Sequence, residues 1–167
     1  MTAAKPETDG FGALAAGPRE AGRLVAVVGR FHGESGHEVG PAQNAAVHAL
    51  CSDPALGRAW LLADAGGRDA GYALAYWRHS IDHGGRVAVL DDLWNDAALR
   101  GRGLGRRLMD AVLADMSACG ARTVVLEADP ADAPAMSFYA RLGFAPKDTA
   151  LLARALPAAE TPLVGGA

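Results

Sequence analysis

The chain has 167 residues, about half of them hydrophobic, and carries a formal net charge of −3 at neutral pH. This length suffices for one domain with a proper hydrophobic core, and no uninterrupted apolar run approaches the ~18–20 residues that a membrane-spanning helix needs. The slightly acidic balance argues against a general nucleic-acid binder, which would normally present a basic face.

The N-terminal segment, the two cysteines and a pair of histidines bear on the cellular compartment of the protein and on whether it binds a metal. The N-terminal segment lacks the long apolar core of a secretory signal peptide. Cys51 and Cys119 lie far apart without a metal-ligand spacing, so idle thiols in a reducing compartment are favoured over a disulfide. His79 and His83 flank Asp82 in a turn, but no third ligand accompanies them. We therefore expect a cytoplasmic protein without a bound metal.

The hydrophobic pattern predicts one folded domain over residues 19–156. Residues 1–18 are rich in Ala, Gly and Pro and are expected to form a flexible lead-in with a poor first strand near Phe11–Ala15. Residues 157–167 are expected to form a flexible tail. Apolar residues at helical spacing predict a first helix over Arg23–His32, with Leu24, Val27, Val28 and Phe31 on its apolar side.

Pro41 is well placed as the first residue of a second helix. Its apolar side is predicted to carry Ala42, Ala45, Ala46, Ala49 and Leu50. The remaining predicted elements, in chain order, are strands at Trp60–Ala63, Gly71–Trp77 and Val87–Asn95, a helix from Leu104 to Met116, a doubly buried strand at Thr123–Glu127, a short helix at Ala133–Leu142 and a final strand at Leu151–Leu156. This order predicts an α/β fold with a mixed sheet.

A loop rich in glycine and arginine precedes the long predicted helix. The apolar side of that helix is predicted to carry Leu104, Leu108, Ala111, Val112 and Met116. Gly101, Gly103 and Gly105 alternate just before it, and glycines allow tight turns and close approach of a ligand to the backbone. The first N–H groups of a helix have no internal partner and lie at the positive end of its dipole. The loop is therefore interpreted as a cradle for a phosphate or pyrophosphate. Four arginines add positive charge around it: Arg100, Arg102, Arg106 and Arg107.

The spacing of the glycines indicates which type of phosphate-binding loop this is. No GxxxxGK run followed by Ser or Thr is present, which excludes a P-loop. A dinucleotide fingerprint would need a third glycine where Leu108 stands. The pattern that fits is R-x-x-G-x-G, from Arg100 to Gly105.

Further along the chain, Ser137–Phe144 reads Ser-Phe-Tyr-Ala-Arg-Leu-Gly-Phe. In this order the two motifs resemble the signature motifs of the GNAT superfamily of acyl-CoA-dependent N-acyltransferases, and the resemblance extends from Arg19 to Leu156. It implies the GNAT fold, a mixed and mostly antiparallel sheet with helices on both faces. In that fold the strands corresponding to Val87–Asn95 and Thr123–Glu127 splay apart, and acetyl-CoA lies in the wedge between them.

The resemblance also implies a set of cofactor-binding residues. The strand end would hold the thioester and pantetheine, and the loop would bind the pyrophosphate. The implied residues are Leu93, Trp94, Asn95, Arg100, Gly101, Arg102, Gly103, Leu104, Gly105, Arg106, Asp132 and Ser137. Two of them depart from the family pattern, since Asn95 replaces a small branched residue and Asp132 stands where an asparagine often binds pantetheine.

Amide formation from a thioester requires a base for the acceptor amine and an acid for the departing thiolate. Tyr139 matches the family's tyrosine beside the CoA sulfur and is expected to be the acid. Asp91 and Asp92 are the candidate proton acceptors, since carboxylates late in an apolar strand are costly unless paired or solvated. Strand alternation places Asp91 with Leu93 and Asn95, and Asp91 matches a glutamate of spermidine/spermine acetyltransferases. Asp91 is therefore ranked first. The alternative interpretation is that either carboxylate simply satisfies loop N–H groups or binds the substrate cation.

The resemblance places the acceptor site at two loops. One contains Glu34, His37 and Glu38, whose acidic pair suits an amine, and the other is Pro146–Thr149. We expect an acetyltransferase acting on a primary amine of a small molecule or protein, by direct attack in a ternary complex, with neither nucleic acid nor membrane as partner. Because dimers are frequent in that superfamily, the resemblance also implies a homodimer as one option for this chain. The alternatives are a non-catalytic acyl-CoA-binding sensor and an unrelated nucleotide-binding protein.

Overall fold

The computed structural model describes residues 10–34 and 36–156. Half of the predicted lead-in (residues 1–9) and the whole predicted tail (residues 157–167) lie outside the described residues. The chain divides into two compact units, Met1–Asp129 and Pro130–Ala167, which are treated separately below. None of the described helices is long and apolar enough to cross a membrane.

The first unit is built on a five-stranded sheet with the order β1-β2-β3-β4-β5. The strands are β1 (Gly12–Ala15), β2 (Gly57–Ala63), β3 (Asp69–Ser80), β4 (Gly85–Asn95) and β5 (Thr123–Leu126). The pairs β1·β2, β2·β3 and β3·β4 are antiparallel, and β5 runs parallel to β4. The mixed, mostly antiparallel sheet predicted from the sequence is therefore confirmed, including the poor first strand.

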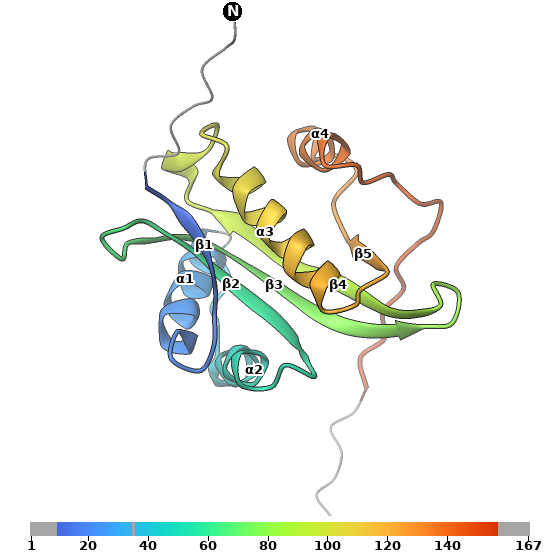
Figure 1. The fold of residues 1–167 in the computed structure, drawn as a ribbon, viewed down its shortest axis with the longest axis horizontal. Coiled ribbons are helices and arrows are strands. Elements are labelled where there is room, and N and C mark those ends of the chain that lie inside the picture. The colour runs from blue at the N-terminus through green and yellow to red at the C-terminus, as the bar shows by residue number, and fades with distance from the viewer. Residues whose placement is uncertain (1–9, 35, 157–167) are drawn as a thin grey trace, which may run out of the picture. The chain divides into compact units, whose positions relative to one another are not determined.

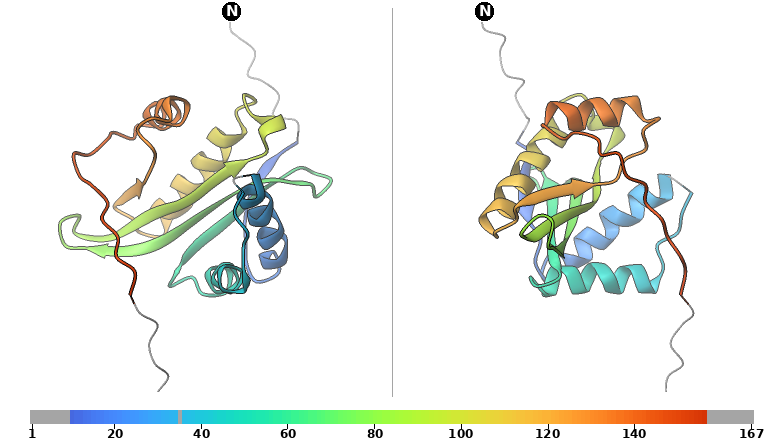
Figure 2. Two further views of the ribbon diagram at one scale, coloured as in Figure 1. Left: turned by 180° about the vertical axis from the view of Figure 1, so that it is seen from behind. Right: turned by 90° about the vertical axis from the view of Figure 1, so that its right-hand side faces the viewer.

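Helices cover both faces of this sheet (Figures 1 and 2). On one face lie α1 (Ala21–Glu34) and α2 (Pro41–Ser52), and on the other lies α3 (Leu104–Ala118). The predicted apolar stripe of α1 is confirmed, because Leu24, Val27 and Val28 are buried. The stripe of α3 is confirmed at four of its five positions, and Met109 is buried where the partly exposed Ala111 was expected.

The predicted apolar face of α2 is wrong. Its four alanines are exposed and Leu50 is half-buried, whereas Val47 and Cys51 are the buried residues. An alanine-rich helix gives an ambiguous periodicity, because alanine tolerates both water and the core. The larger Val47 gains more from burial and decides which face turns inward.

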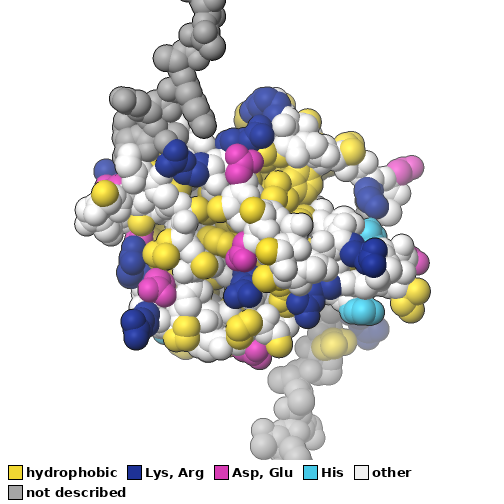
Figure 3. Space-filling view, viewed as in Figure 1, with side chains coloured by type: hydrophobic (Ala, Val, Ile, Leu, Met, Phe, Trp, Pro, Cys, Tyr) yellow, Lys and Arg dark blue, Asp and Glu magenta, His cyan; other side chains and the backbone are white. Residues whose placement is uncertain are grey.

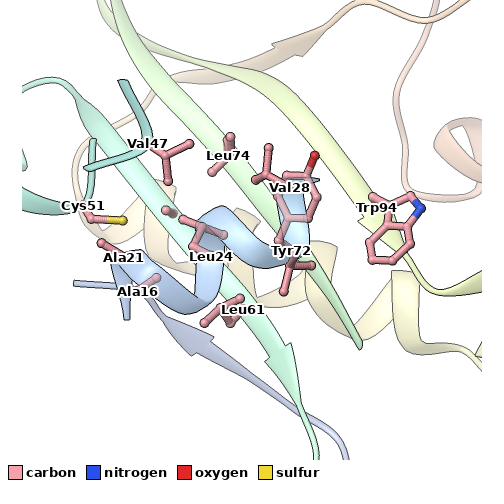
Figure 4. Packing of buried hydrophobic residues seen from close by; sticks show 12 residues of the cluster. Ala16, Ala21, Leu24, Val28, Val47, Cys51, Leu61, Tyr72, Leu74 and Trp94 are labelled. Carbon is pink, nitrogen blue, oxygen red and sulfur yellow. The ribbon is translucent and has the colours of Figure 1, made fainter. Parts of the chain in front are cut away.

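The core between α1, α2 and the sheet ends in a group of aromatic rings (Figure 4). Tyr72 of β3 is fully buried and Trp94 of β4 is 5% exposed. Their ring centroids lie 6.2 Å apart, and Phe31 of α1 lies 6.2 Å from Tyr72 and 6.3 Å from Trp94. These rings tie the last turns of α1 to the end of β4.

Pairing between β4 and β5 covers only part of β4. It runs from Val87↔Thr123 to Leu90↔Leu126, and β4 then continues to Asn95 paired with β3 alone. This is the divergence of the two strands that the resemblance implied. The prediction that β5 is buried on both faces is wrong, because all four of its residues are only half-buried. In the described part of the sheet β5 is an edge strand, and its outer side lacks a neighbour.

The second unit contains α4 (Ala133–Arg141), close to the helix predicted there. Tyr139 lies between Phe138 and Phe144, at centroid distances of 5.2 and 5.8 Å. The predicted final strand at Leu151–Leu156 is wrong, because this segment has no regular structure and its three leucines are 71–89% exposed. Apolar residues alone do not make a strand, since its backbone groups need a neighbouring ladder.

Candidate active site

A β-bulge shapes β4 at its acidic residues. Leu90 pairs with Ala75 and Asp92 pairs with Leu74, so Asp91 is the extra residue without a partner in the register. Leu90 and Asp92 consequently lie on opposite faces of the sheet although they are two residues apart. Strict alternation was the basis for grouping Asp91 with Leu93 and Asn95, and the bulge removes that basis. The bulge also lies where β4 and β5 diverge.

Asp92 lies on the face of the sheet that α1 covers. It shares this face with Tyr72 and Trp94, because Tyr72 pairs with Trp94 and Leu74 pairs with Asp92. The Tyr72 hydroxyl donates a hydrogen bond to Oδ2 of Asp92 at 3.1 Å. Burial raises the pKa of Asp92 and nearby Asp91 adds to this effect, while the Tyr72 bond and His32 oppose it. Asp92 is therefore a half-buried carboxylate with an increased affinity for a proton.

Tyr72 was missed in the sequence interpretation. Its pKa is raised, chiefly by burial and then by the nearby Asp92 charge, so the hydroxyl keeps its proton and acts as the donor. The available signal was an aromatic residue in the alanine-rich strand GYALAYW, next in the meander to the acidic strand. Without the register of β3 against β4, however, Tyr72 and Tyr76 could not be told apart.

Glu34 reaches the same region from α1. It is the last residue of that helix rather than part of the loop to which it was assigned. Its Oε2 accepts a hydrogen bond from Nε1 of Trp94 at 3.2 Å, and the guanidinium of Arg30 lies 5.6 Å from the centroid of the Trp94 ring. Glu34 thus lies next to the strand end that carries Asp92.

The other two residues predicted for the acceptor site lie in the connection to α2. His37 and Glu38 are exposed. The backbone N–H of His37 donates to the carbonyl of His32 at 2.9 Å, which closes the end of α1. The structure therefore brings Glu34, but neither the His37 nor the Glu38 side chain, into contact with the strand-end residues.

Leu93 and Asn95 lie on the opposite face of β4 from Asp92. They pair with Ala73 and Gly71. The Asn95 amide donates to the backbone carbonyl of Asp96 at 3.4 Å. Gly71 is required here, because a Cβ on it would come within 2.6 Å of the Trp94 carbonyl oxygen.

A short, well-capped loop joins β4 to the glycine cradle. Asp96 accepts a hydrogen bond from the N–H of Ala98 at 3.0 Å and begins a 3-10 turn, η1 (Ala97–Leu99). Gly101 and Gly103 then adopt positive φ angles of 77° and 79°, which favour glycine. Gly103 is the N-cap of α3.

The cradle fits an anionic group. Gly103 accepts the N–H of Arg107 at 3.0 Å, so the N–H groups of Leu104, Gly105 and Arg106 precede the first helical bond. A Cβ on Gly101 or Gly103 would meet no atom within 4 Å, so space beside the backbone is open. Leu104 is buried and anchors the first helical turn in the core. N–H groups without an intrahelical acceptor at a helix N-terminus suit a phosphate or pyrophosphate.

The arginines around the cradle have different surroundings. Arg100 and Arg102 are exposed, whereas Arg106 pairs with Asp110 at 3.2 Å along the helix. Arg107 donates to the backbone carbonyl of Phe11 and so ties α3 to the start of β1. On the face displayed in Figure 3, basic and acidic side chains intermingle rather than forming one continuous basic surface.

The remaining predicted residues belong to the second unit. The Asp132 carboxylate accepts the N–H of Ala135 at 3.0 Å, so it caps α4 as an asparagine could. The Ser137 hydroxyl accepts a hydrogen bond from Arg141 at 2.6 Å. Burial raises the pKa of Tyr139, and the Asp132 charge adds to this, so the phenol stays protonated at neutral pH.

Comparison with solved structures shows the same fold in several proteins. An integron cassette protein from the mobile metagenome of Cole Harbour Salt Marsh is 28% identical, with a TM-score of 0.77 over 87% of this chain and 90% of that one. An aminoglycoside acetyltransferase from an uncultured soil metagenomic sample, in complex with trehalose, is 14% identical, with a TM-score of 0.77 over 90% and 99%. An aminoglycoside N-acetyltransferase in complex with CoA is 18% identical, with a TM-score of 0.74 over 90% and 97%.

A comparison with curated proteins gives no match. Residues 26–144 match the family model described as the acetyltransferase (GNAT) family. This range includes both sequence motifs, the bulged strand and the glycine cradle. The chain therefore belongs to the GNAT family of acetyltransferases.

Proposed function

We propose that the chain is an N-acetyltransferase that transfers an acetyl group from acetyl-CoA to a primary amine of a small molecule or protein, by direct attack in a ternary complex. The observation that carries this proposal is that one continuous segment contains both a half-buried carboxylate and a loop suited to bind an anion. Asp92 lies where β4 leaves β5, and the cradle of Gly101 and Gly103 follows directly at the start of α3.

Acetyl-CoA, as co-substrate, supplies an activated thioester. The residues proposed to hold it are the backbone N–H groups of the cradle, for the pyrophosphate, and the backbone at the end of β4 around Leu93, Trp94 and Asn95, for the thioester arm. Arg100 and Arg102 add positive charge to the cradle. Asp132 and Ser137 are assigned to the cofactor through the family resemblance, and both also stabilise α4 itself.

Asp92, ahead of Asp91, is the proposed proton acceptor. An amine attacks only as the free base, so the N–H bond must break and its proton must pass to a base. Burial raises the pKa of Asp92 and makes it a stronger base than an ordinary aspartate, whereas Asp91 is exposed. Glu34, beside Trp94, and the negative end of the α1 dipole favour the approach of a cationic amine.

Tyr139 is the proposed proton donor to the departing thiolate, by its match to the family motif. A phenol with a raised pKa holds its proton through the neutral range and can therefore serve as an acid. Its ring is fixed by Phe138 and Phe144, which limits the positions of the hydroxyl.

The test has two stages. Thermal unfolding is followed with acetyl-CoA, CoA, ATP and NAD, each at saturation; a ligand at ~100 times its dissociation constant stabilises the folded state by about 2.7 kcal/mol. A shift with acetyl-CoA and CoA alone supports the proposal. Thiol release is then measured with a panel of polyamines, aminoglycosides, amino acids and lysine peptides. Binding of CoA without release for any amine would favour an acyl-CoA sensor, and no shift with CoA would refute the cradle assignment.

A further inference from the structure

The Tyr72 hydroxyl is buried and directed at the carboxylate proposed to accept the proton. Tyr72 is fully buried, and its hydroxyl, the one polar group of the side chain, donates to Oδ2 of Asp92 at 3.1 Å. A buried hydroxyl is costly unless it is paired, so this contact is a fixed part of the folded protein. The partner is the one half-buried carboxylate of β4, at the bulge.

The ring of Tyr72 has little freedom to move. It is packed by Phe31 from α1 and Trp94 from β4, each 6.2 Å away between ring centroids, and lies in the core cluster shown in Figure 4. The register of β3 against β4 sets Tyr72 diagonally across from Asp92 on the same face. The hydroxyl therefore has a defined position relative to the carboxylate.

The bulge is what brings this pair together. If β4 alternated regularly from Leu90, Asp92 would lie on the face of Leu90, away from Tyr72. The extra residue, Asp91, moves Asp92 to the Tyr72 face. A bulge that changes the direction of one side chain is typical of functional sites.

We propose that Tyr72 is a positioning residue for Asp92: its hydroxyl holds Oδ2, leaves Oδ1 to take the proton of the acceptor amine, and favours the ionised carboxylate. This inference rests on the proposed role of Asp92. Within residues 10–34 and 36–156, Tyr72 provides the only hydrogen bond to the Asp92 carboxylate. Tyr72 itself does not touch the reacting atoms in this scheme.

Three groups act electrostatically on the Asp92 carboxyl, and they come from β3, α1 and β4. Tyr72 on β3 and His32 on α1 favour the charged form, and Asp91 on β4 disfavours it. Glu34 lies one contact further away, bonded to Trp94. Removal of the Tyr72 hydroxyl therefore raises the pKa of Asp92. Because the reaction needs the ionised carboxylate, a variant without the hydroxyl should lose activity at a higher pH than the wild type does when the solution is acidified.

The experiment compares the pH dependence of kcat/KM in the wild type, Tyr72→Phe, Tyr76→Phe and Asp92→Asn. Phenylalanine keeps the ring packing of Tyr72 and removes only the donor. Tyr76 lies on the same strand, is 42% exposed and serves as the matched control. In the wild type, kcat/KM is expected to fall at acidic pH as Asp92 is protonated; this fall is the acidic limb of the profile. In Tyr72→Phe the midpoint of the acidic limb should move up by roughly one pH unit, the effect of one hydrogen bond to a charged group. Tyr76→Phe should keep the wild-type limb.

A direct titration keeps the test decisive if Tyr72→Phe is nearly inactive. The carboxyl carbon of Asp92 is followed by NMR in the full chain, with and without the Tyr72 hydroxyl, and the upward shift should appear there as well. The role of Tyr72 would be overturned, and the proposed base left intact, by two results together: Tyr72→Phe keeps the wild-type pH dependence of kcat/KM and the wild-type Asp92 titration, and Asp92→Asn loses the fall in kcat/KM at acidic pH. Full activity and an unchanged limb in Asp92→Asn would overturn both.

Discussion

The indole Nε1 of Trp94 donates a hydrogen bond to Oε2 of Glu34 at 3.2 Å and joins the end of β4 to the last residue of α1. Trp94 is buried whereas Glu34 is exposed, so a core residue orients a surface carboxylate. A second contact, from Arg30 over the indole ring, stabilises the same arrangement. Glu34 is thereby held against Trp94, two residues beyond Asp92 on β4, where the acceptor is proposed to bind.

Glu34→Gln should weaken binding of a cationic acceptor without a large change in kcat. Glutamine keeps an oxygen for the Trp94 N–H and removes the negative charge. Because Glu34 is exposed, KM should rise only about two- to five-fold, the range of a surface charge pair. Initial rates against acceptor concentration, at low and high salt, measure this effect. Glu38→Gln, in the exposed connection to α2, is the matched control, and an equal effect of the two substitutions would argue against Glu34.

Gly103→Ala should weaken CoA binding through the cradle. Gly103 has φ 79°, and a left-handed conformation costs an alanine roughly 1–2 kcal/mol. Relief of this strain shifts the neighbouring N–H groups that are proposed to bind the pyrophosphate, and Gly103→Asp adds charge repulsion that should abolish binding. Calorimetric titration with CoA provides the measurement.

Gly120 offers a control with the same backbone strain at the other end of α3. Its φ is 85°, and a Cβ there also meets nothing within 4 Å. Gly120→Ala should lower stability about as much as Gly103→Ala and leave CoA affinity unchanged. If both variants lost CoA affinity together, the loss would reflect general destabilisation rather than the cradle.

Much of the fold follows from local pattern. Local signals predicted the stripe of α1, four of the five stripe positions of α3, the order of β2, β3 and β4, and Pro41 at the start of α2, and these are confirmed. The alanine face of α2 and the strand at Leu151–Leu156 were wrong, because small or apolar residues permit more than one environment. Whether such residues become buried depends on the element that packs against them, and the local sequence of neither segment identifies that element.

The candidate site was predictable only in part for a related reason. The cradle is a local feature of glycine spacing, and the positive φ angles of Gly101 and Gly103 agree with it. The environment of Asp92 instead depends on a one-residue bulge, and strict alternation cannot reveal a bulge. The contacts of Tyr72 with Asp92 and of Glu34 with Trp94 form only in the tertiary fold. The sequence therefore indicated Glu34 only through the family resemblance, and Tyr72 only as one of two tyrosines in the strand before the acidic one.

Tyr139→Phe should lower turnover and leave CoA affinity nearly intact. The ring contacts with Phe138 and Phe144 are kept, and only the proposed proton donor is removed. General acid–base groups typically contribute 10²–10⁴-fold to a rate. Steady-state kcat and calorimetric CoA binding separate the two effects. Tyr76→Phe serves as the control for loss of a phenol, and equal rates in wild type and Tyr139→Phe would exclude Tyr139 from the mechanism.

Asp92→Asn should make the protein more stable at neutral pH while it impairs catalysis. Because burial raises the folded-state pKa of Asp92 above its unfolded value, the folded chain binds the proton more tightly. Stability contributed by this group is present at low pH and is lost as the pH rises through the folded pKa. Asparagine is neutral throughout and can still accept the Tyr72 bond, so the variant avoids that loss.

Urea unfolding of wild type and Asp92→Asn from about pH 3 to 8 measures this difference. The free energies of unfolding should converge at the acidic end, where the wild-type carboxyl is protonated, and separate as the pH rises, with the Asp92→Asn variant the more stable of the two. Asp91→Asn is the control: Asp91 is exposed, and its removal only relieves repulsion on Asp92, so its gain should be smaller. A variant that becomes less stable than wild type as the pH rises would show that the Asp92 charge stabilises the fold, contrary to a carboxylate retained for catalysis.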